Sequence, residues 1–244
     1  MTQINATLTY IFHSGFVIST DQYSILIDYW RDTESEEKGY VHSLFLSAPG
    51  KLYVLSSHAH PDHFNPEVLK WREQKPDIQY VFSSDIQPSI NIGDFGAVYL
   101  DKSEIFTDPF LRIQAFGSTD IGISFAIEAA GKRIFHAGDF NNWHWNEEST
   151  EEEIRQAERS FLRKLKILAK AYPAFDLVMF PVDPRLGKDY MRGAEQFVRT
   201  IRTGIFAPMH FGFNYAEAKA FAPIALAHKC HFFSIEKCGE NREF

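Results

Sequence analysis

The sequence is poor in cysteine and in positive charge, and it lacks long hydrophobic runs. Two cysteines, Cys230 and Cys238, among 244 residues are too few for the disulfide framework of a small secreted domain. Lys and Arg total 25 against 32 Asp and Glu, a formal net charge of −7 without a basic cluster, which argues against nucleic acid as a partner. No apolar segment reaches the length that spans a bilayer, and no signal-like pattern precedes Tyr10. We therefore expect a cytoplasmic protein in a reducing compartment, with no membrane partner.

The composition that remains is that of an ordinary globular chain, with 45% hydrophobic, 15% aromatic and 23% charged residues. A chain of this length can bury roughly 70 to 75% of its unfolded surface, so disulfides are not needed for stability. The sequence has no Pro-, Gly- or Ser-rich linker, no repeat and no low-complexity tract. We expect one domain over residues 1–244, with sheets covered by helices in a layered α/β or α+β arrangement.

Hydrophobic periodicity predicts mostly β-structure in the first 140 residues. A β-meander is predicted over residues 7–28. Residues 31–50 are too charged and irregular for a core element, and we interpret them as a surface loop. A short helix to about Glu73 is predicted after Asn65, a good N-cap followed by proline. Further strands are predicted at 51–57, 78–83, 97–100, 110–116, 123–128 and 132–135.

Helices and strands alternate in the second half. Thr150 and Glu153 have the spacing of a capping box at the start of a helix predicted over 151–172, and Pro173 ends it. A strand at 177–182, a helix at 189–202, a strand at 205–209, a helix interrupted by Pro223 and a last strand at 232–235 follow.

Three of the ten histidines lie close together after the strand predicted at 51–57, in the string Ser57-His58-Ala59-His60-Pro61-Asp62-His63. Because side chains of a strand alternate between its faces, His58 and His60 leave the strand end on the same side and can share one ion. A bend at Pro61 then directs the next two side chains toward a second ion. Imidazole and carboxylate are ligands suited to Zn²⁺ and other first-row divalent ions. The alternative is a polar surface turn with incidental histidines.

Four further stretches accompany this string: Ile11-Phe12-His13-Ser14-Gly15-Phe16, Leu26-Ile27-Asp28, Phe135-His136-Ala137-Gly138-Asp139 and Pro208-Met209-His210-Phe211. In this order and spacing, nearly the whole chain resembles the metallo-β-lactamase superfamily of metal-dependent hydrolases, and within it the branch of ascorbate-6-phosphate lactonase-like proteins. The resemblance implies an α+β fold, a four-layer αββα sandwich with a site for two metal ions along one edge of its sheets. It assigns His58 and His60 to the first ion and Asp62, His63 and His210 to the second, with Asp139 bridging both.

One departure from the family pattern affects the first ion. Where the family usually supplies a third histidine, this chain has Ala115-Phe116-Gly117-Ser118-Thr119-Asp120, with Gly117 at the position of the lost ligand. The first site is therefore expected to be weak, differently liganded or empty. Asp120 could supply an oxygen and His144 a nitrogen. A turn for Asp120 and a loop side chain stacked among tryptophans for His144 are the alternatives.

Other polar residues are expected near the same edge. The resemblance implies that Asp28 braces the metal loop, and His13 could hydrogen-bond a ligand or the substrate. Asp183, at a predicted strand end, is a secondary candidate. The alternatives are turn formers for the two aspartates and a satisfied core histidine for His13. His136 should face away from Asp139 and is not expected to bind metal. The C-terminal cluster of His228, Cys230, His231 and Cys238 lacks the spacing of a structural zinc site, which favours buried thiols.

The predicted function is a hydrolase in which two divalent ions, zinc by default with manganese or iron using the same ligand types, activate a water molecule. Asp62 or Asp139 would handle the proton. The substrate would be a small ester, lactone or phosphodiester with an apolar or sugar-like face, because aromatic residues are expected to roof the site: Trp143, Trp145, Phe211, Phe213 and Tyr215.

Two other functions stay open: a non-catalytic ligand-binding or sensor protein on a degenerate scaffold, and a nuclease of the same fold, which the net charge disfavours. An oxygen-reducing di-iron relative is disfavoured because that branch of the family has glutamate where this chain has His60. Whether the chain forms a homo-oligomer is left open.

Overall fold

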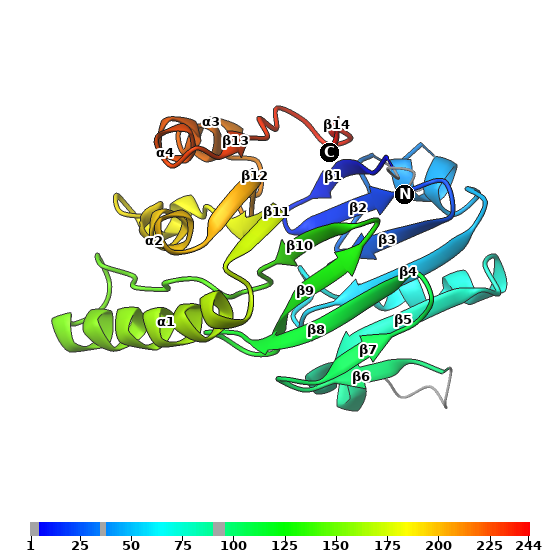
Figure 1. The fold of residues 1–244 in the computed structure, drawn as a ribbon, viewed down its shortest axis with the longest axis horizontal. Coiled ribbons are helices and arrows are strands. Elements are labelled where there is room, and N and C mark those ends of the chain that lie inside the picture. Colours follow the sequence, from blue (N-terminus) through cyan, green and yellow to red (C-terminus); the bar gives the residue numbers. More distant parts are fainter. Residues whose placement is uncertain (1–4, 35–37, 90–95) are drawn as a thin grey trace.

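Two seven-stranded sheets stack face to face in the computed structural model, which describes residues 5–34, 38–89 and 96–244 (Figure 1). The first sheet has, in spatial order, β14 (Asn241–Glu243), β1 (Thr7–Phe12), β2 (Gly15–Ser19), β3 (Tyr23–Ile27), β4 (Lys51–Ser56), β5 (Ile78–Ser83) and β6 (Val98–Leu100). The second has β13 (His231–Phe232), β12 (Arg202–Met209), β11 (Ala174–Pro181), β10 (Lys132–His136), β9 (Ile123–Ala129), β8 (Leu111–Gly117) and β7 (Ile105–Thr107).

The strand directions bring several strand ends to one edge. In the first sheet, β2 is antiparallel to both β1 and β3, and β3 is parallel to β4, so β1, β3 and β4 all run the same way. In the second sheet β10, β11 and β12 are parallel. The two sets meet: the His210 amide donates to the His13 carbonyl over 3.0 Å, and the Ile123 amide donates to the Ser57 carbonyl over 2.9 Å. The residues that follow these six strands are therefore neighbours, as at the carboxyl edges of α/β sheets.

A continuous hydrophobic core fills the space between the sheets. It includes Phe16 and Ile27 of the first sheet and Ile113 and Ile127 of the second. The same cluster extends beneath the helices on the outer face of the second sheet. Burial of apolar surface on both faces of this sheet is the main stabilising contribution to the fold.

The outer face of the second sheet carries α1 (Glu151–Ala171), α2 (Arg192–Thr200), α3 (Tyr215–Lys219) and α4 (Ala222–Ala227), as Figure 1 shows. The predicted capping box is present at the start of α1, where the Thr150 side chain accepts from the Glu153 amide and the Glu153 carboxylate accepts from the Thr150 amide. The predicted apolar stripe buries Phe161, Leu165 and Leu168. The α+β sandwich expected from the sequence is confirmed.

The fourth layer, over the first sheet, differs from the expected helical layer. Within the described residues it consists of the short π-helix η1 (Val41–Phe45) and the 3₁₀ segments η2 (Pro66–Glu73) and η3 (Ser84–Ser89). Their apolar side chains form a second hydrophobic cluster with the outer face of the sheet, including Val41, Phe45, Val68 and Trp71. The helix predicted at 66–73 is thus a 3₁₀ helix.

The expectation that 31–50 is only a surface loop was wrong in part, although residues 35–37 lie outside the described residues. Val41 and Phe45 are buried because Asp32 folds the segment inward. Its carboxylate accepts from the amides of Val41 and His42 over 3.0 and 2.9 Å and pairs with the His42 ring. This local network of polar contacts has no periodic signature in the sequence.

Other boundaries also changed on folding. The helix predicted at 189–202 is shorter, and the one interrupted by Pro223 is two helices, with Pro223 in the first turn of α4. The strand predicted at 232–235 is only β13, although Phe233 and Ile235 beyond it are buried. The sequence did not predict η4 (Pro184–Leu186) or the short strands β7 and β14. These two strands are largely exposed and pair with β8 and β1, respectively.

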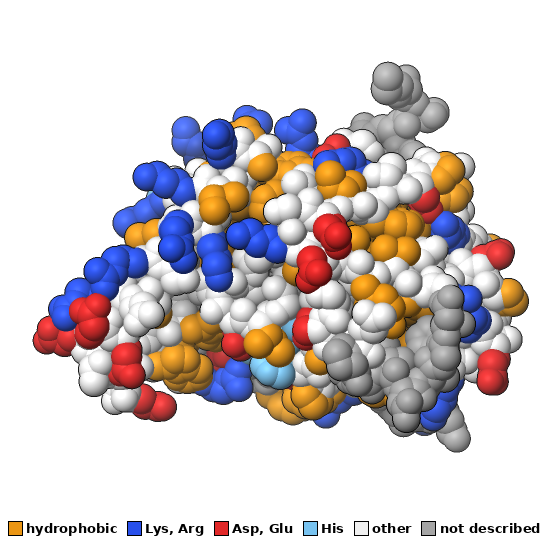
Figure 2. All heavy atoms as spheres, turned by 90° about the horizontal axis from the view of Figure 1, so that it is seen from below, with side chains coloured by type: hydrophobic (Ala, Val, Ile, Leu, Met, Phe, Trp, Pro, Cys, Tyr) orange, Lys and Arg blue, Asp and Glu red, His pale blue; other side chains and the backbone are white. Residues whose placement is uncertain are grey.

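The surface carries a feature that the linear sequence does not show. Lys and Arg side chains gather on the side of the molecule where α1 and α2 lie (Figure 2). Arg163, Lys166 and Lys170 are exposed along α1, whereas Arg155 and Arg159 pair with glutamates of the same helix. The expectation of no basic cluster was therefore wrong, because the helix places residues four apart on one face. None of the helices in the described part of the chain could cross a membrane.

Phe180 provides a test of the core beneath α1 and α2. Its ring is fully buried, with its centroid 4.8 Å from that of Phe197 and 6.3 Å from those of Phe140 and Phe161. We expect Phe180→Ala to lower the free energy of unfolding by about 3–5 kcal/mol in urea denaturation, because it leaves a cavity. The matched control Phe213→Ala removes a ring that is 67% exposed and should cost less than about 1 kcal/mol. Equal losses for the two variants would contradict this account of the core.

Candidate metal centre

The site lies where strands from both sheets end, and sharp turns direct its side chains. His13, Asp28 and His210 directly follow β1, β3 and β12, and their φ angles are +56°, +49° and +65°. Such left-handed conformations are uncommon for residues other than glycine and occur often at functional sites. The sheets also approach closely here, because Gly122 and Gly138 lack side chains: a Cβ at either position would collide with Ser57.

Asp28 holds the metal loop in place from behind. It is fully buried and accepts hydrogen bonds from the Ser57 amide, the Ser57 hydroxyl and Nδ1 of His63, each over 2.7 Å. The proton on Nδ1 leaves the Nε2 lone pair of His63 directed forward, as in the carboxylate–histidine pairs behind metal ligands. Asp28 thus contacts both Ser57 and His63, an arrangement that the bracing role implied by the resemblance would require.

Asp183 occupies the equivalent position behind His210. Its buried carboxylate accepts from Nδ1 of His210 over 2.9 Å, which leaves Nε2 of that ring free to bind an ion. The same carboxylate accepts from Nε and Nη2 of Arg185 over 3.0 and 2.7 Å. Asp183 thus fixes the orientation of the His210 ring by a hydrogen bond, and its role in the site stays a prediction.

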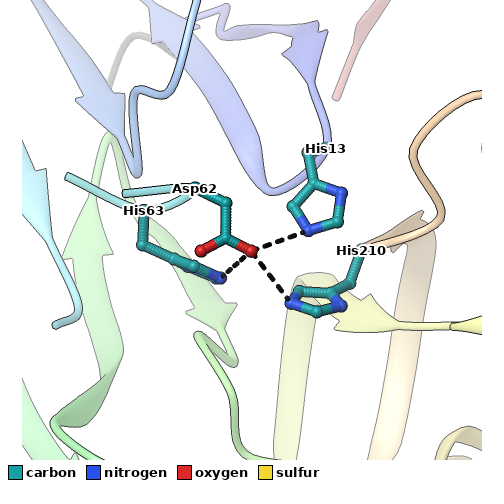
Figure 3. A group of neighbouring side chains, drawn as sticks. All are labelled: His13, Asp62, His63 and His210. Atoms are coloured by element: carbon teal, nitrogen blue, oxygen red, sulfur yellow. Dashed lines mark ion pairs between the residues drawn. The ribbon is translucent and has the colours of Figure 1, made fainter. Parts of the chain in front are cut away.

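Four residues converge in front of these two carboxylates: His13, Asp62, His63 and His210 (Figure 3). Each can offer one ligand atom such that all four atoms lie within 4.8 Å of one another. Oδ2 of Asp62 lies 3.4 Å from Nε2 of His13 and 3.9 Å from Nε2 of both His63 and His210. The sequence had placed His13 near the site only as a hydrogen-bonding residue, whereas the structure includes it in the group.

A second group of His58, His60 and Asp139 adjoins the first. Nε2 of His58 lies 3.0 Å from Nδ1 of His60 and 3.4 Å from Oδ2 of Asp139. The other oxygen of Asp139, Oδ1, lies 3.1 Å from Nε2 of His63 and 3.2 Å from Nε2 of His210. Asp139 thus faces both groups, one oxygen toward each, as a bridging ligand would.

Buried atoms without partners show that these residues fit divalent ions. In the described part of the chain, Nε2 of His13, Nε2 of His63, Nε2 of His210 and Oδ1 of Asp139 make no hydrogen bond. The short distances to Asp139 lack the alignment that a hydrogen bond requires. Buried polar atoms are rarely left unpaired, and nitrogen lone pairs facing a carboxylate need a cation between them. The residues present therefore fit a metal site, and both groups could hold an ion.

The electrostatics of the site also call for positive charge. Burial would raise the pKa of Asp139, but the imidazoles of His63 and His210 outweigh it and hold that pKa below its ordinary value. Burial would likewise lower the pKa of His63, but Asp28 and Asp139 raise it to about 10, so without a metal ion this ring carries a second proton, on Nε2, which a bound ion would replace. Burial lowers the pKa of His13 to about 4, which keeps this ring neutral at pH 7. The carboxylates are thus anionic, as metal ligands must be.

A cleft of about 330 Å³ opens in front of the two groups of possible metal ligands. Its lining consists of His60, Asp62, Thr119, Asp120, Asp139, Trp143, Trp145, Arg185 and His210. Trp143 and Trp145 lie nearly parallel, 16° apart, and Nε1 of Trp143 donates to the Asp139 carbonyl over 2.7 Å. Asp120 reaches the cleft but does not join either ligand group, so its role as an extra ligand stays a prediction.

The expectation that His144 could supply a ligand was wrong. His144 does not face the site, because its Nε2 lies 3.1 Å from the Asp189 carbonyl and its Nδ1 accepts from the Asn146 amide. Gly117 lies beside the side chain of Lys102, while Thr119 and Asp120 of the same loop line the cleft.

The predicted aromatic roof is also smaller than expected. Phe211 is buried against Tyr10, Phe213 packs on Phe12, and Tyr215 contacts Phe211. Within the described residues, only Trp143 and Trp145 of the predicted aromatic set line the cleft. His136 accepts from the Gly138 amide and contacts the Ser14 carbonyl, consistent with the expectation that it is not a ligand.

Sequence reasoning missed Arg185. The signal was present in Asp183-Pro184-Arg185, where the Asp183 side chain accepts from the Arg185 amide over 3.0 Å and begins the 3₁₀ turn η4. An aspartate cap followed by proline at a strand end fixes the next side chain close to the cap. The Arg185 side chain is therefore held beside Asp183 and His210 at the end of the strand.

The carboxylates behind the ligands can be tested directly. We expect Asp183→Asn to weaken zinc binding at the site of His210 by about 10- to 100-fold. The substitution removes the negative charge that orients the His210 ring and raises its basicity. Competition with a chromophoric chelator measures this. The control Asp108→Asn alters a partly buried, ion-paired aspartate, which pairs with Lys51 at the opposite end of β4 and should leave zinc affinity unchanged. Equal zinc affinity in Asp183→Asn and the unaltered protein would contradict the role of Asp183.

Comparisons with known proteins agree with this geometry. The family model described as "Beta-lactamase superfamily domain" matches residues 7–155, more than half of the chain. Among curated proteins none matches significantly. The ascorbate-6-phosphate lactonase-like branch is not singled out by any of these findings, so that part of the resemblance is not confirmed.

Several solved structures share the fold. Igni18, described as a novel metallo hydrolase from the archaeon Ignicoccus hospitalis, is 19% identical over 98% of both chains, with a TM-score of 0.70. YhfI from Bacillus subtilis, a metallo-beta-lactamase fold protein, is 14% identical over 99% of this chain and 100% of its own, with a TM-score of 0.65. CmlA, a diiron beta-hydroxylase from Streptomyces venezuelae, is 12% identical over 98% of this chain and 54% of its own, with a TM-score of 0.61. With the two-sheet sandwich and the His/Asp groups at its edge, the chain belongs to the family of the beta-lactamase superfamily domain and has the metallo-β-lactamase fold.

Proposed function

We propose that this protein hydrolyses a small ester, lactone or phosphodiester with the help of two divalent ions. The observation that carries the proposal is the set of buried, unpartnered ligand atoms on His13, His63, His210 and Asp139. A site without ions would leave these atoms unsatisfied, at a cost of about 1–3 kcal/mol each. Asp139, with one oxygen facing each group, favours two adjacent ions over one.

A divalent ion bound at such a site would supply a nucleophile from water at neutral pH and polarise the group under attack. The chain's own residues would then orient the substrate and move the proton. Oδ2 of Asp62 faces the three histidines, while the Asp62 side chain is 28% exposed and lines the cleft. We assign Asp62 as the proton acceptor and Asp139 as the bridging ligand, because only 7% of the Asp139 side chain is exposed.

The cleft supports a small-molecule substrate. Its volume of about 330 Å³ is at the lower end of the range of ligand pockets, and its paired tryptophans offer a flat apolar surface. Igni18, which shares the fold, is described as a metallo hydrolase, and this is consistent with the assignment. CmlA, with a di-iron centre and hydroxylase activity, shows that the fold also hosts other chemistry. Zinc is the ion we propose first, with manganese and iron tested beside it.

Loss of single ligands should separate the two ions. We expect the zinc-loaded protein to hold close to two ions per chain, His60→Ala about one, and Asp139→Ala close to none, measured by elemental analysis after desalting. Hydrolysis of 4-nitrophenyl acetate or bis(4-nitrophenyl) phosphate should fall by about a hundredfold or more in both variants, because stabilisation of the reacting group is lost. His231→Ala, an exposed histidine outside the site, should change neither ion content nor rate.

Two results would overturn this function. Undiminished hydrolysis by protein that holds no metal would exclude the mechanism. A protein that holds no ions, hydrolyses neither ester and binds a small ligand tightly would support the sensor alternative instead.

A further inference from the structure

Arg185 is the only Lys or Arg side chain among the described residues that line the cleft. The other charged residues there are Asp62, Asp120 and Asp139. Two of these face the metal groups, so their charge would be offset by bound ions. A lone guanidinium in a site that otherwise binds cations requires an explanation beyond metal binding.

The guanidinium of Arg185 is held rigidly on one edge and free on the other. Nε and Nη2 donate to the buried carboxylate of Asp183 over 3.0 and 2.7 Å, and Nη2 also lies 3.1 Å from Nδ1 of His210. Within the described residues, Nη1 has no hydrogen-bond partner. The side chain is 57% exposed although its partner Asp183 is 1% exposed. The fixed edge orients the group, and the free edge remains for a ligand.

The position of the group relates it to the reaction centre. Nδ1 and Nε2 are on the same ring of His210, and Nε2 faces Asp139 and Asp62. Arg185 is therefore separated from the metal groups by the width of one imidazole. Trp143 lines the same cleft, with its ring 5.4 Å from that of His210. A molecule held at the metal groups would extend between the tryptophans and this guanidinium.

We propose that Arg185 determines substrate specificity by binding an anionic group of the substrate, a carboxylate or a phosphate, adjacent to the bond that is cleaved. This rests on the proposed hydrolase function. Guanidinium donors match the geometry of both anions and form charge-assisted hydrogen bonds with them. Asp120, whose carboxylate is at the same cleft, would repel an anion from its own position and so favour one orientation of the substrate.

A purely structural role for Arg185, neutralising Asp183, makes a different prediction. It would affect every substrate equally, because the orientation of His210 would change whatever the substrate's charge. Binding of an anionic group instead predicts a loss confined to anionic substrates. The ratio of rates for charged and neutral substrates therefore separates the two roles.

The experiment compares three aryl acetates with the zinc-loaded protein: 4-acetoxybenzoate, 4-acetoxyphenylphosphonate and methyl 4-acetoxybenzoate. The first two carry an anion that differs in type, and the third is neutral with the same ring and the same scissile ester. We expect Arg185→Gln to lower kcat/KM for one or both anionic esters by about 10- to 100-fold, the range for a hydrogen bond to a charged group. The neutral ester should change by less than about threefold.

Arg199→Gln is the matched control, because it removes the same charge from an exposed position on α2 where Arg199 pairs with Glu195. It should alter none of the three rates. Comparison of the carboxylate and phosphonate esters identifies which anion the site prefers. Zinc content is measured for each variant, so that a loss of metal is recognised. Equal losses for charged and neutral esters, or no loss for either anion, would overturn the proposal and assign Arg185 a structural role.

A second readout keeps the proposal testable if no ester is hydrolysed. In that case the proposed hydrolase function fails, and binding of phenylphosphonate to the zinc-loaded protein is measured by isothermal titration. A Kd that rises about tenfold in Arg185→Gln but not in Arg199→Gln would support anion recognition by Arg185. An unchanged Kd, or no binding to the unaltered protein, would overturn it.

Discussion

The structure depends on one electrostatic constraint: imidazole nitrogens and carboxylate oxygens are buried facing one another at a single edge of the sheets. Nε2 of His63 and of His210 lie 3.1 and 3.2 Å from the same oxygen of Asp139 without hydrogen-bonding geometry. Asp28 and Asp183 fix the two rings from behind and keep their lone pairs directed inward. Imidazole lone pairs and carboxylate oxygens that face one another repel, so this arrangement requires positive charge between them.

The fold brings these atoms together from distant parts of the chain. Strands from two sheets end at the same edge, and backbone bonds such as that from the His210 amide to the His13 carbonyl join them there. Left-handed turns at His13, Asp28 and His210 carry a conformational cost that packing elsewhere compensates. Glycine at 122 and 138 permits the close approach to Ser57. A rigid scaffold of this kind fixes the candidate ligands relative to the cleft. Metal-assisted hydrolysis requires such fixed positions.

Features that depend on residues close together in the sequence were predicted well, whereas contacts between distant residues were predicted poorly. His58 and His60 meet as expected, although both lie beyond the end of β4 and not on the strand, and the capping box at Thr150 followed from spacing alone. Resemblance to a family was needed to associate Asp139 and His210 with them. Arg185 could not be placed without the fold, and His144 was misplaced because its contact with Asp189 spans 45 residues. The 3₁₀ and π segments over the first sheet follow from polar contacts such as those of Asp32, which have no periodicity.

The central claim is that these residues converge to bind two divalent ions, and X-ray diffraction at the zinc absorption edge tests it most directly. Crystals of the zinc-loaded protein should show two anomalous peaks. One should be ligated by Nε2 of His13, His63 and His210 and by the carboxylate of Asp62, and the other by His58 and His60, with Asp139 contacting both. No anomalous peak at this edge, with water molecules or rotated rings satisfying the same nitrogens, would contradict the account.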